Sequence, residues 1–338
     1  MVTADDSSPA RHIGHVLAAL ACDIIGAVLR STCLLIACGC LFLSCARQSP
    51  SSVAIARPEP DILAAALHAE TTPLSAADID HLLAEVDAEA DSIRPASPTT
   101  PAQLLAALNR HFFGPDGFTA LQDLTTPENT SVAAVLENRR GTCMGLAIVY
   151  LALAERLGLS AHAVATPVHL FMRVELPDGP RNVELLEEGR ELPDDIYRRR
   201  NRISESSIER GVFLRDLTND EVIAHLLSNQ GIALSRENRL DDALARYDRA
   251  LKLAPQLVVA WYNRGIDLTT AGRLDGAVAS FDAAIDLHPN DAQAHNNRGI
   301  AKARLGDMDG ARADWQRALE LEPGIREAEE NLRKLGGS

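Results

Sequence analysis

The C-terminal third of the chain repeats with a period of 34 residues, and this period restricts the fold more than any other feature of the sequence. Four residue classes keep the spacing: Gly231, Gly265 and Gly299; Ala243, Ala277 and Ala311; Tyr247, Phe281 and Trp315; Pro255, Pro289 and Pro323. Small residues let paired helices approach closely, an aromatic ring fills the groove between them, and proline ends the second helix of a pair. The pattern therefore predicts three stacked helix pairs, at residues 222–255, 256–289 and 290–323.

This spacing resembles the tetratricopeptide repeat, and the polar segment 325–335 is expected to form a capping helix, so that the repeat domain spans residues 221–338. In this repeat class, polar side chains on the first helix of each pair often bind peptide main chain or carboxylates. Here those positions hold Asn229, Asn263, Asn297, Arg264 and Arg298. The resemblance implies one of two roles for the array: it binds a protein or peptide partner, or it only stabilises the domain before it.

A second segment predicts a buried helix with a cysteine at its start. The run from Met144 to Ala154 is apolar on all sides of a helix, which indicates a position inside a core. Thr142 is a suitable N-cap, and Gly158 is a typical residue just beyond a helix C-terminus. Cys143 would then lie in the first turn, where free backbone N–H groups and the positive end of the helix dipole favour a thiolate over a thiol. This position suits a nucleophile.

Three strands are expected after this helix, at residues 160–165, 169–176 and 181–186. The second strand begins with His169, and the third contains Glu184. A cysteine at a helix N-terminus, followed by a histidine and a carboxylate on neighbouring strands, supplies the nucleophile, base and orienting group of cysteine acyl-transfer chemistry.

The same segments resemble the transglutaminase-like superfamily, in the bacterial branch whose core is followed by tetratricopeptide repeats. The runs that carry the likeness are Arg140-Gly141-Thr142-Cys143-Met144-Gly145-Leu146, Leu153-Ala154-Glu155-Arg156-Leu157-Gly158-Leu159, Pro167-Val168-His169-Leu170-Phe171-Met172-Arg173 and Arg181-Asn182-Val183-Glu184. The resemblance implies an α+β papain/transglutaminase-like core, followed here by an all-α tetratricopeptide repeat solenoid. It also implies Cys143 as the nucleophile, His169 as the base and Glu184 as the third member of the site.

The chain departs from the superfamily pattern at two positions. The superfamily usually has Asp where Glu184 stands, and this branch usually has Gly where Val168 stands. Some relatives lack the cysteine, so the fold also occurs without the chemistry.

The expected hairpin between the last two strands tests the third member of the site. If residues 177–180 form the turn, Arg173 faces Glu184 and His169 faces Glu188. His169 and Glu184 then share one face of the sheet but lie four residues apart, which is about 13 Å along a strand. An asymmetric or bulged hairpin would bring them together. Otherwise Glu184 pairs with Arg173, and Glu188 orients the histidine.

The domain before the repeats is expected to span residues 61–220, with helices that cover the apolar helix because a small sheet cannot bury it alone. Asn129 either lines the site and donates to an oxyanion, or caps the following helix. The polar segment 191–220, which includes Arg198–Arg202, is expected to be a solvated connector, with contact to an anionic substrate or lipid headgroups as the alternative. No matched partners are evident for three histidines, which are expected to be ordinary surface or core residues: His68, His111 and His162.

Residues 1–45 predict an export signal. An apolar run ends at Leu43-Ser44-Cys45. The segment resembles a bacterial lipoprotein signal, which has a basic residue, about a dozen apolar residues and then a small residue before a cysteine. Cys45 is the expected lipid-bearing residue and Cys38 the alternative, while an uncleaved transmembrane helix is a further alternative. Residues 46–60, rich in Ser, Pro and Ala, would form a linker. The protein is therefore expected to be a membrane-anchored lipoprotein on the periplasmic side of the cell envelope, and the long leader suggests a start of translation near Val28.

The composition limits the kinds of partner and cofactor that the protein is expected to bind. A net charge of -14, without a Lys/Arg-rich run that interleaves aromatics, argues against nucleic acid. No motif predicts a cofactor, and no tight His/Asp/Glu cluster predicts a metal site. Every cysteine except Cys143 lies in the leader, so a disulfide within the mature chain is excluded. A lone thiol in an exported protein is open to oxidation, which favours a chemical role for Cys143 over that of a buried core cysteine.

These observations predict a cysteine-dependent acyl-transfer enzyme that acts on an amide. With water as the acceptor it would be a peptidase or amidase, and with an amine a transglutaminase. The competing hypothesis is a non-catalytic scaffold of the cell envelope that binds partners through its repeats.

Overall fold

The computed structural model describes residues 61–95, 99–121, 127–167, 169–201 and 203–336, which belong to one compact unit. The predicted leader, with Cys38 and Cys45, and the predicted linker 46–60 lie outside the described residues. The elements follow in this order: α2 (Ile62–His68), α3 (Ala76–Ile93), α4 (Pro101–Phe112), β1 (Thr119–Ala120), η2 (Pro127–Thr130), α5 (Val132–Asn138), β2 (Arg140–Gly141), α6 (Cys143–Leu157), β3 (Ala161–Ala165), β4 (Leu170–Val174), β5 (Arg181–Glu184), β6 (Arg190–Glu191), α7 (Asp194–Arg200), α8 (Glu205–Glu209), α9 (Asn219–Arg236), α10 (Leu240–Leu253), α11 (Val258–Thr270), α12 (Leu274–Leu287), α13 (Ala292–Leu305), α14 (Met308–Leu321) and α15 (Arg326–Gly336). Within these ranges, no helix combines the length and the apolar character needed to cross a bilayer.

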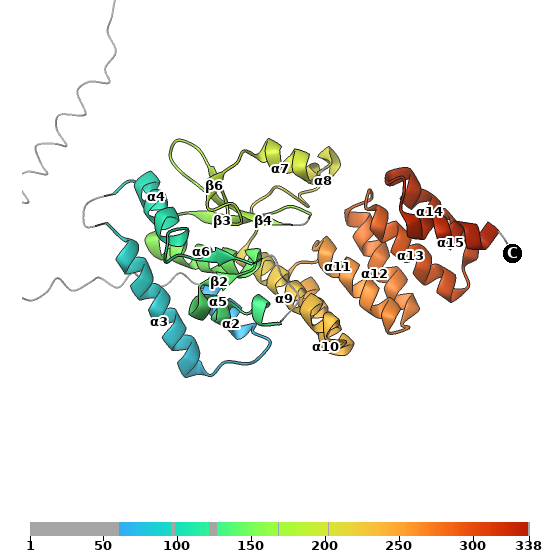
Figure 1. Ribbon diagram of the computed structural model, residues 1–338, viewed down its shortest axis with the longest axis horizontal. Coiled ribbons are helices and arrows are strands. Elements are labelled where there is room, and N and C mark those ends of the chain that lie inside the picture. Colours follow the sequence, from blue (N-terminus) through green and yellow to red (C-terminus); the bar gives the residue numbers. More distant parts are fainter. Residues whose placement is uncertain (1–60, 96–98, 122–126, 168, 202, 337–338) are drawn as a thin grey trace, which may run out of the picture. The chain divides into compact units, whose positions relative to one another are not determined.

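Helix α6 is the centre of the N-terminal domain, as its apolar sequence predicts. From Met144 to Leu157, every residue except Glu155 is buried. Helices α2, α3, α4 and α5 contact α6, as do strands β3 and β4. Figure 1 shows the sheet on one side of α6 and helices α2, α3 and α5 on the other. The helix ends where predicted, because Gly158 adopts the left-handed conformation with a φ of 75° and donates its N–H to the last turn.

Strands β3 to β6 form one antiparallel sheet in chain order. The predicted register of the β4–β5 hairpin is wrong by two residues, because Arg173 faces Asn182 and not Glu184. The connection is longer than a four-residue turn, since the ladder ends at the pair Val174 and Arg181. The alternative in which Glu184 pairs with Arg173 is therefore also wrong. The Arg173 guanidinium instead donates to the side chains of Asn182, Asp194 and Asp216.

The region predicted as a solvated connector, residues 191–220, has more structure than expected. It contains the short helices α7 and α8, followed by a segment, residues 211–217, that runs along the free edge of β3 and is called the strap below. In the strap, the N–H groups of Leu214 and Leu217 donate to carbonyls of β3 at 3.0 and 2.8 Å. Three arginines of this region pair with nearby acids: Arg198 bonds Glu205, Arg199 bonds Asp195 and Arg200 bonds Glu187.

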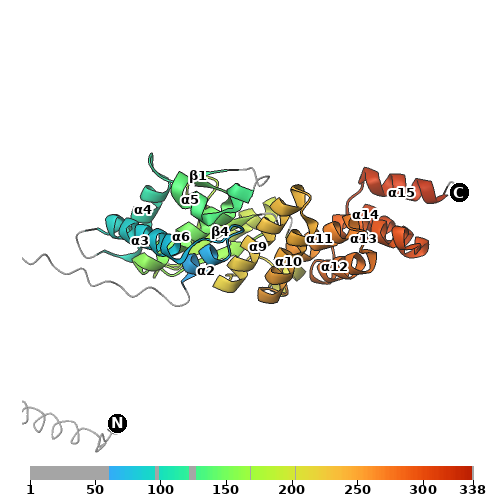
Figure 2. The same cartoon turned by 90° about the horizontal axis from the view of Figure 1, so that it is seen from below.

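The 34-residue period corresponds to the helix pairs α9/α10, α11/α12 and α13/α14, and α15 follows as the predicted cap (Figure 2). A Cβ added to Gly231, Gly265 or Gly299 would lie 2.5 to 2.7 Å from the aromatic ring of its own repeat. The rings that meet these glycines are Tyr247, Phe281 and Trp315. The repeated glycine is therefore a steric requirement of close helix pairing, as the sequence predicts.

The first helix pair also packs on the N-terminal domain. Helix α9 contacts α2 and α6, and one continuous apolar cluster extends from α2 and α6 into the repeats. On α10, the Arg246 guanidinium donates to the main-chain carbonyls of Ala69 and Glu70 at 2.8 and 3.3 Å. The strap reaches the second repeat, because Val212 and Phe213 share a buried cluster with Val258 and Ala284. The core and the repeats thus have buried apolar contacts in common.

Candidate active site

Cys143 is the first residue of α6, at a helix N-terminus that its own cap leaves open. Thr142 has the extended conformation of an N-cap, but its side chain makes no capping hydrogen bond. Its hydroxyl oxygen is buried without a hydrogen-bond partner among the described residues. Helices α3, α4 and α9, in contrast, begin with complete capping boxes. The first N–H groups of α6 therefore remain available to a negative charge on the Cys143 sulfur or on a bound oxyanion.

Two glycines let α5 pack against the segment that carries Cys143. A Cβ added to Gly141 or Gly145 would lie 2.4 or 2.7 Å from Cγ2 of Val135. No side chain fits at such a distance, so Gly141 and Gly145 permit close packing of α5 on α6. The cysteine itself is half-buried and is the free cysteine of the described chain.

His169 stands in the turn between β3 and β4 and is held there by Thr166. The Thr166 hydroxyl donates to the His169 carbonyl at 2.9 Å and accepts the His169 N–H at 3.0 Å. The Thr166 N–H also donates to the His169 carbonyl, at 2.8 Å. These three bonds fix the backbone of the histidine. Val168, the departure from the family pattern, lies outside the described residues.

Glu184 meets His169, with 2.6 Å between Oε1 of the carboxylate and Nε2 of the imidazole. The observed register, continued by one residue, leaves Glu184 two residues from His169 instead of the predicted four, and a glutamate can span that offset. Leu186 donates its N–H to the same carboxylate oxygen at 3.1 Å. Because Nε2 is bound to Glu184, Nδ1 is the ring nitrogen left for Cys143. The reserve candidate Glu188 is wrong for the orienting role, because it lies exposed in the next turn with a φ of 54°.

Tyr197 lies near the Glu184 carboxylate and was not predicted from the sequence. It is buried, and its ring stacks on Phe171 with centroids 3.8 Å apart. Burial, together with the negative charge of nearby Glu184, raises the pKa of Tyr197. Only the fold brings this α7 residue to the back of the sheet, and its position in a polar segment gave no periodic signal.

The electrostatic state of His169 follows from its neighbours. Burial acts to lower the pKa of His169, but hydrogen bonds with Cys143 and Glu184, and the charges of both groups, raise it to about 9. The ring is therefore an imidazolium at neutral pH, flanked by a carboxylate and a sulfur. That is the arrangement of a cysteine–histidine catalytic pair with an orienting acid.

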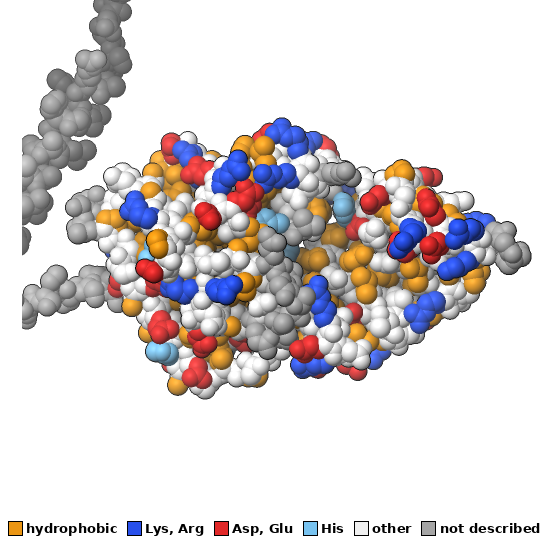
Figure 3. Space-filling model, viewed as in Figure 1, with side chains coloured by type: hydrophobic (Ala, Val, Ile, Leu, Met, Phe, Trp, Pro, Cys, Tyr) orange, Lys and Arg blue, Asp and Glu red, His pale blue; other side chains and the backbone are white. Residues whose placement is uncertain are grey.

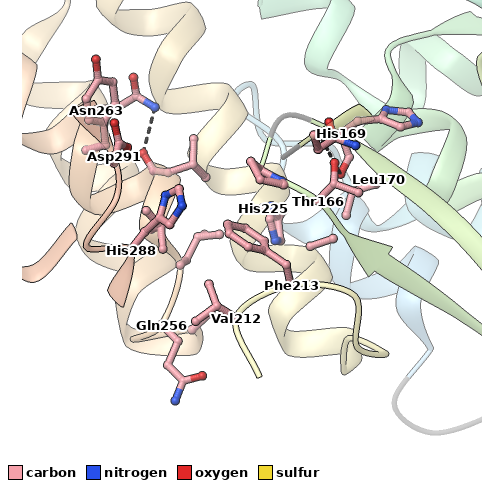
Figure 4. A pocket seen from close by; sticks show the side chains of 18 of the residues that line it. Thr166, His169, Leu170, Val212, Phe213, His225, Gln256, Asn263, His288 and Asp291 are labelled. Carbon is pink, nitrogen blue, oxygen red and sulfur yellow. Dashed lines mark hydrogen bonds between the residues drawn. The ribbon is translucent and has the colours of Figure 1, made fainter. Parts of the chain in front are cut away.

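Cys143 and His169 open into a cavity of about 660 Å³, called the Cys143 cavity below (Figure 4). Phe213 of the strap and His225 of α9 lie in its middle, with His169 on one side and His288 and Asn263 on the other. Burial lowers the pKa of His225 to about 4, so this histidine is neutral at physiological pH. The cavity lining was not predicted from the sequence, although α9 carries a pattern that could have indicated it. The residues Glu221, His225, Asn229 and Ile232 recur at helical spacing and form one stripe of α9 that lines the cavity.

Several other predicted positions turn out differently. Asn129 is not the cap of α5, since Ser131 occupies the N-cap and accepts the Ala134 N–H at 3.1 Å, and Asn129 is not among the residues that line the Cys143 cavity. His111 does have a partner, because its Nε2 lies 2.6 Å from Oε1 of Glu89. Across the described ranges, no cluster of three or more His, Cys, Asp and Glu side chains is placed to hold a metal ion.

Comparison with known families assigns the two parts of the chain. Residues 75–228 match the model of the transglutaminase-like superfamily, and residues 228–286 and 262–325 match the tetratricopeptide repeat. The protein thus combines a transglutaminase-like domain with tetratricopeptide repeats. The predicted family and fold class are confirmed.

Individual relatives match part of the chain. A UPF0162 protein of Xylella fastidiosa (strain 9a5c) is 29% identical over 157 residues, which are 45% of this chain and 56% of that protein. The UPF0162 protein YchA of Escherichia coli (strain K12) is 33% identical over 155 residues, which are 43% of this chain and 55% of that protein. The chain therefore spans about half the length of the curated relatives it matches.

Two solved structures of repeat proteins are also similar. The first tetratricopeptide repeat domain of Spaghetti (RPAP3), bound to an HSP90 peptide, is 27% identical with a TM-score of 0.33, over 34% of this chain and 90% of that chain. YrrB, a tetratricopeptide repeat protein with an unusual peptide-binding site, is 24% identical with a TM-score of 0.31, over 33% of this chain and 61% of that chain.

Proposed function

We propose that the protein is a cysteine-dependent acyl-transfer enzyme that acts on an amide of a protein or peptide. The observation that carries the proposal is the meeting of Cys143, at the open N-terminus of α6, with the His169–Glu184 pair at one cavity. The raised pKa of His169, to about 9, supports it because an imidazolium stabilises a neighbouring thiolate.

In the proposed reaction, Cys143 Sγ attacks the carbonyl carbon of the amide, and N–H groups of the first turn of α6 stabilise the oxyanion. His169 gives its proton to the leaving nitrogen as the C–N bond breaks, and a thioester with Cys143 forms. Water or an amine then attacks the thioester and passes a proton to His169, and the thiolate leaves. Glu184 holds the imidazole in position and stabilises its charge. Water gives hydrolysis and an amine gives transamidation.

The pH dependence of alkylation tests the proposal. The full-length protein is treated with iodoacetamide between pH 5 and 9, and labelling is read by mass spectrometry on the tryptic fragment Gly141–Arg156, which contains no other cysteine. The alkylation of an isolated thiol has its midpoint at about pH 8.5, whereas a thiolate held by an imidazolium reacts well below pH 7. We expect reactivity that persists at pH 5 to 6 and is lost in His169→Ala. An inert Cys143, or a profile that ignores His169, would refute the catalytic proposal.

The competing proposal is a non-catalytic envelope scaffold whose repeats bind a partner. The replacement of the usual acid by Glu184 supports it. It predicts an alkylation profile that is the same in the wild type and in His169→Ala, together with partner binding that survives Cys143→Ala.

We also propose that the protein is exported and held on the periplasmic side of the membrane by a lipid on Cys45, or on Cys38. The apolar run that stops at Cys45 supports this. Metabolic labelling with radioactive palmitate tests it: Cys45→Ser should abolish incorporation if Cys45 is the anchor, and Cys38→Ser should abolish it if Cys38 is. Label that persists in both variants, or that is absent from the wild type, would reject the anchor.

A further inference from the structure

The Cys143 cavity is lined by the transglutaminase-like domain and by all three repeats. The start of α6 and the β3–β4 turn supply the cysteine and histidine, and the strap supplies Phe213. The segment between α7 and α8 adds Asn201 and Ser204. The repeats contribute through α9, the connection between α10 and α11, α11 itself, the connection between α12 and α13 with the start of α13, and the end of α14. Figure 3 shows a hollow on this face that apolar and histidine side chains border. A substrate that fills this cavity would therefore touch Cys143 and the repeats at the same time.

Among the described residues that line the cavity, the repeats supply no Lys or Arg. Arg215 is the one Lys or Arg among the described residues that line it, and its guanidinium binds both carboxylate oxygens of Glu221. Asp291 and Glu322 add negative charge at the repeat end. Burial lowers the pKa of His288, which favours its neutral form. A ligand that ends in a carboxylate would meet repulsion there instead of a clamp.

The repeat arginines that the sequence offered for carboxylate binding are used inside the array. The Arg264 guanidinium donates to Asp248 at 2.9 Å and to Ser280 at 2.7 Å. The Arg298 guanidinium donates to Asp282 at 2.6 Å and to Asp314 at 2.9 Å. Each arginine therefore ties the second helix of one repeat to that of the next, and neither lines the Cys143 cavity.

The polar lining that remains consists mainly of neutral amides. Six carboxamide side chains line the cavity: Asn201, Asn229, Gln256, Asn263, Asn290 and Gln293. Each carboxamide both donates and accepts hydrogen bonds, as a peptide main chain does. Asn263 spends one donor on the Val259 carbonyl at 2.8 Å, which holds its side chain in place. Apolar residues such as Leu257 and Tyr262 lie between these amides, so the lining matches an extended peptide with uncharged side chains.

We propose that the Cys143 cavity binds an internal, uncharged stretch of polypeptide in extended form, and that the repeats form one wall of this substrate cleft. The inference rests on the proposed function only for the bond that Cys143 attacks. Its binding step is independent of that chemistry, so the two can fail separately.

Peptide binding to the full-length Cys143→Ala protein tests the cleft without any reaction. The probes are two pentapeptides, Ala-Leu-Gln-Leu-Ala with rhodamine on the N-terminus, one ending in an amide and one in a free carboxylate. Fluorescence anisotropy gives the Kd of each. We expect the amide form to bind about tenfold more tightly, because the carboxylate meets the acidic end of the cleft. Tighter binding of the carboxylate form, or no binding of either form at ~1 mM, would overturn the proposal.

A charge placed in the cleft sharpens the test. Gln293 is exposed and lines the cavity, whereas Gln316 is exposed on α14 and does not. Gln293→Lys should reduce the preference for the amide form to about twofold or less, and Gln316→Lys should leave it near tenfold. An equal effect of both variants would show that the cleft is not the binding site.

Photo-crosslinking tests the shared wall. A probe with benzoylphenylalanine in place of the central glutamine should label tryptic fragments from both sides, Leu157–Arg173 of the core and Leu253–Arg264 of the second repeat. Labelling confined to the repeats would reduce the site to an ordinary repeat groove and refute the composite cleft.

Discussion

Among its described residues, the N-terminal domain contains two histidine–glutamate pairs with the same separation and different surroundings. His169 and Glu184 lie 2.6 Å apart, and so do His111 and Glu89. The Glu184 side chain is 4% exposed and also accepts the Leu186 N–H, whereas that of Glu89 is 16% exposed and also binds Arg139 at 2.8 Å. His169 borders the Cys143 cavity, and His111 does not. A short distance alone therefore does not mark a catalytic pair. The pair proposed to be catalytic differs from the other in its neighbouring cysteine and, among the described residues, in a carboxylate that binds no arginine.

The histidines should give the largest difference between the pairs. At pH 6, His169→Ala should slow alkylation of Cys143 by about 100-fold, because an unpaired thiol is almost wholly protonated there. His111→Ala should change the rate less than twofold. Both rates are read on the Gly141–Arg156 fragment, and a comparable loss in both variants would erase the distinction.

Substitution of the two glutamates should also slow alkylation of Cys143 more in the His169–Glu184 pair than in the His111–Glu89 pair. Glu184→Gln should lower the alkylation rate at pH 6 by about 30-fold, because the imidazolium loses its stabilising charge and its orientation. Glu89→Gln, the matched change in the other pair, should leave the rate within about twofold. If Glu184→Gln keeps the wild-type profile, Glu184 has no orienting role.

The pH dependence of stability should report on the His169–Glu184 pair. The pKa of His169 is raised from 6.5 to about 9 in the folded protein, so its contribution to stability is complete below pH 6.5 and is lost as the pH rises toward 9. Between pH 6.5 and 8, the free energy of unfolding should fall by ~1.5 kcal/mol more in the wild type than in His169→Gln. Urea unfolding measures this difference. A flat wild-type profile would contradict the raised pKa of His169.

Substitution of Arg139 should have the smallest effect on the reactivity of Cys143. This arginine binds Glu89, stacks over the Phe118 ring at 4.2 Å and adopts a φ of 52° at the end of α5. Arg139→Ala should cost ~1 to 2 kcal/mol in thermal or urea unfolding through the lost ion pair and stacking. Arg139→Gly should regain ~0.5 kcal/mol of this, because glycine accepts the left-handed conformation without strain. Alkylation of Cys143 should stay within about twofold of the wild type in both variants. A larger fall in the alkylation rate would show that the His111–Glu89 pair contributes to the reactivity of Cys143.

Features set by local periodicity could be predicted from the sequence. The all-round apolar run after Cys143 predicted a buried helix, and the recurring glycines and aromatics predicted the helix pairs. The register of the β4–β5 hairpin could not be predicted, because the length of the turn is decided by contacts across the sheet. Arg173, for example, is drawn to Asp194 and Asp216, which lie far along the chain. The prediction therefore left both Glu184 and Glu188 open.

The sequence by itself determined the repeat array and the position of Cys143 at a helix start, because these depend on residue spacing within one or two elements, and the resemblance to the transglutaminase-like superfamily indicated His169 as its partner. Only the tertiary structure decided that Glu184 meets His169, that Tyr197 lies near this glutamate, and that repeat residues line the cavity in front of Cys143. The reason is that these side chains come from separate elements. Packing along α9 and the strap brings them together, and no periodicity of the chain records that packing.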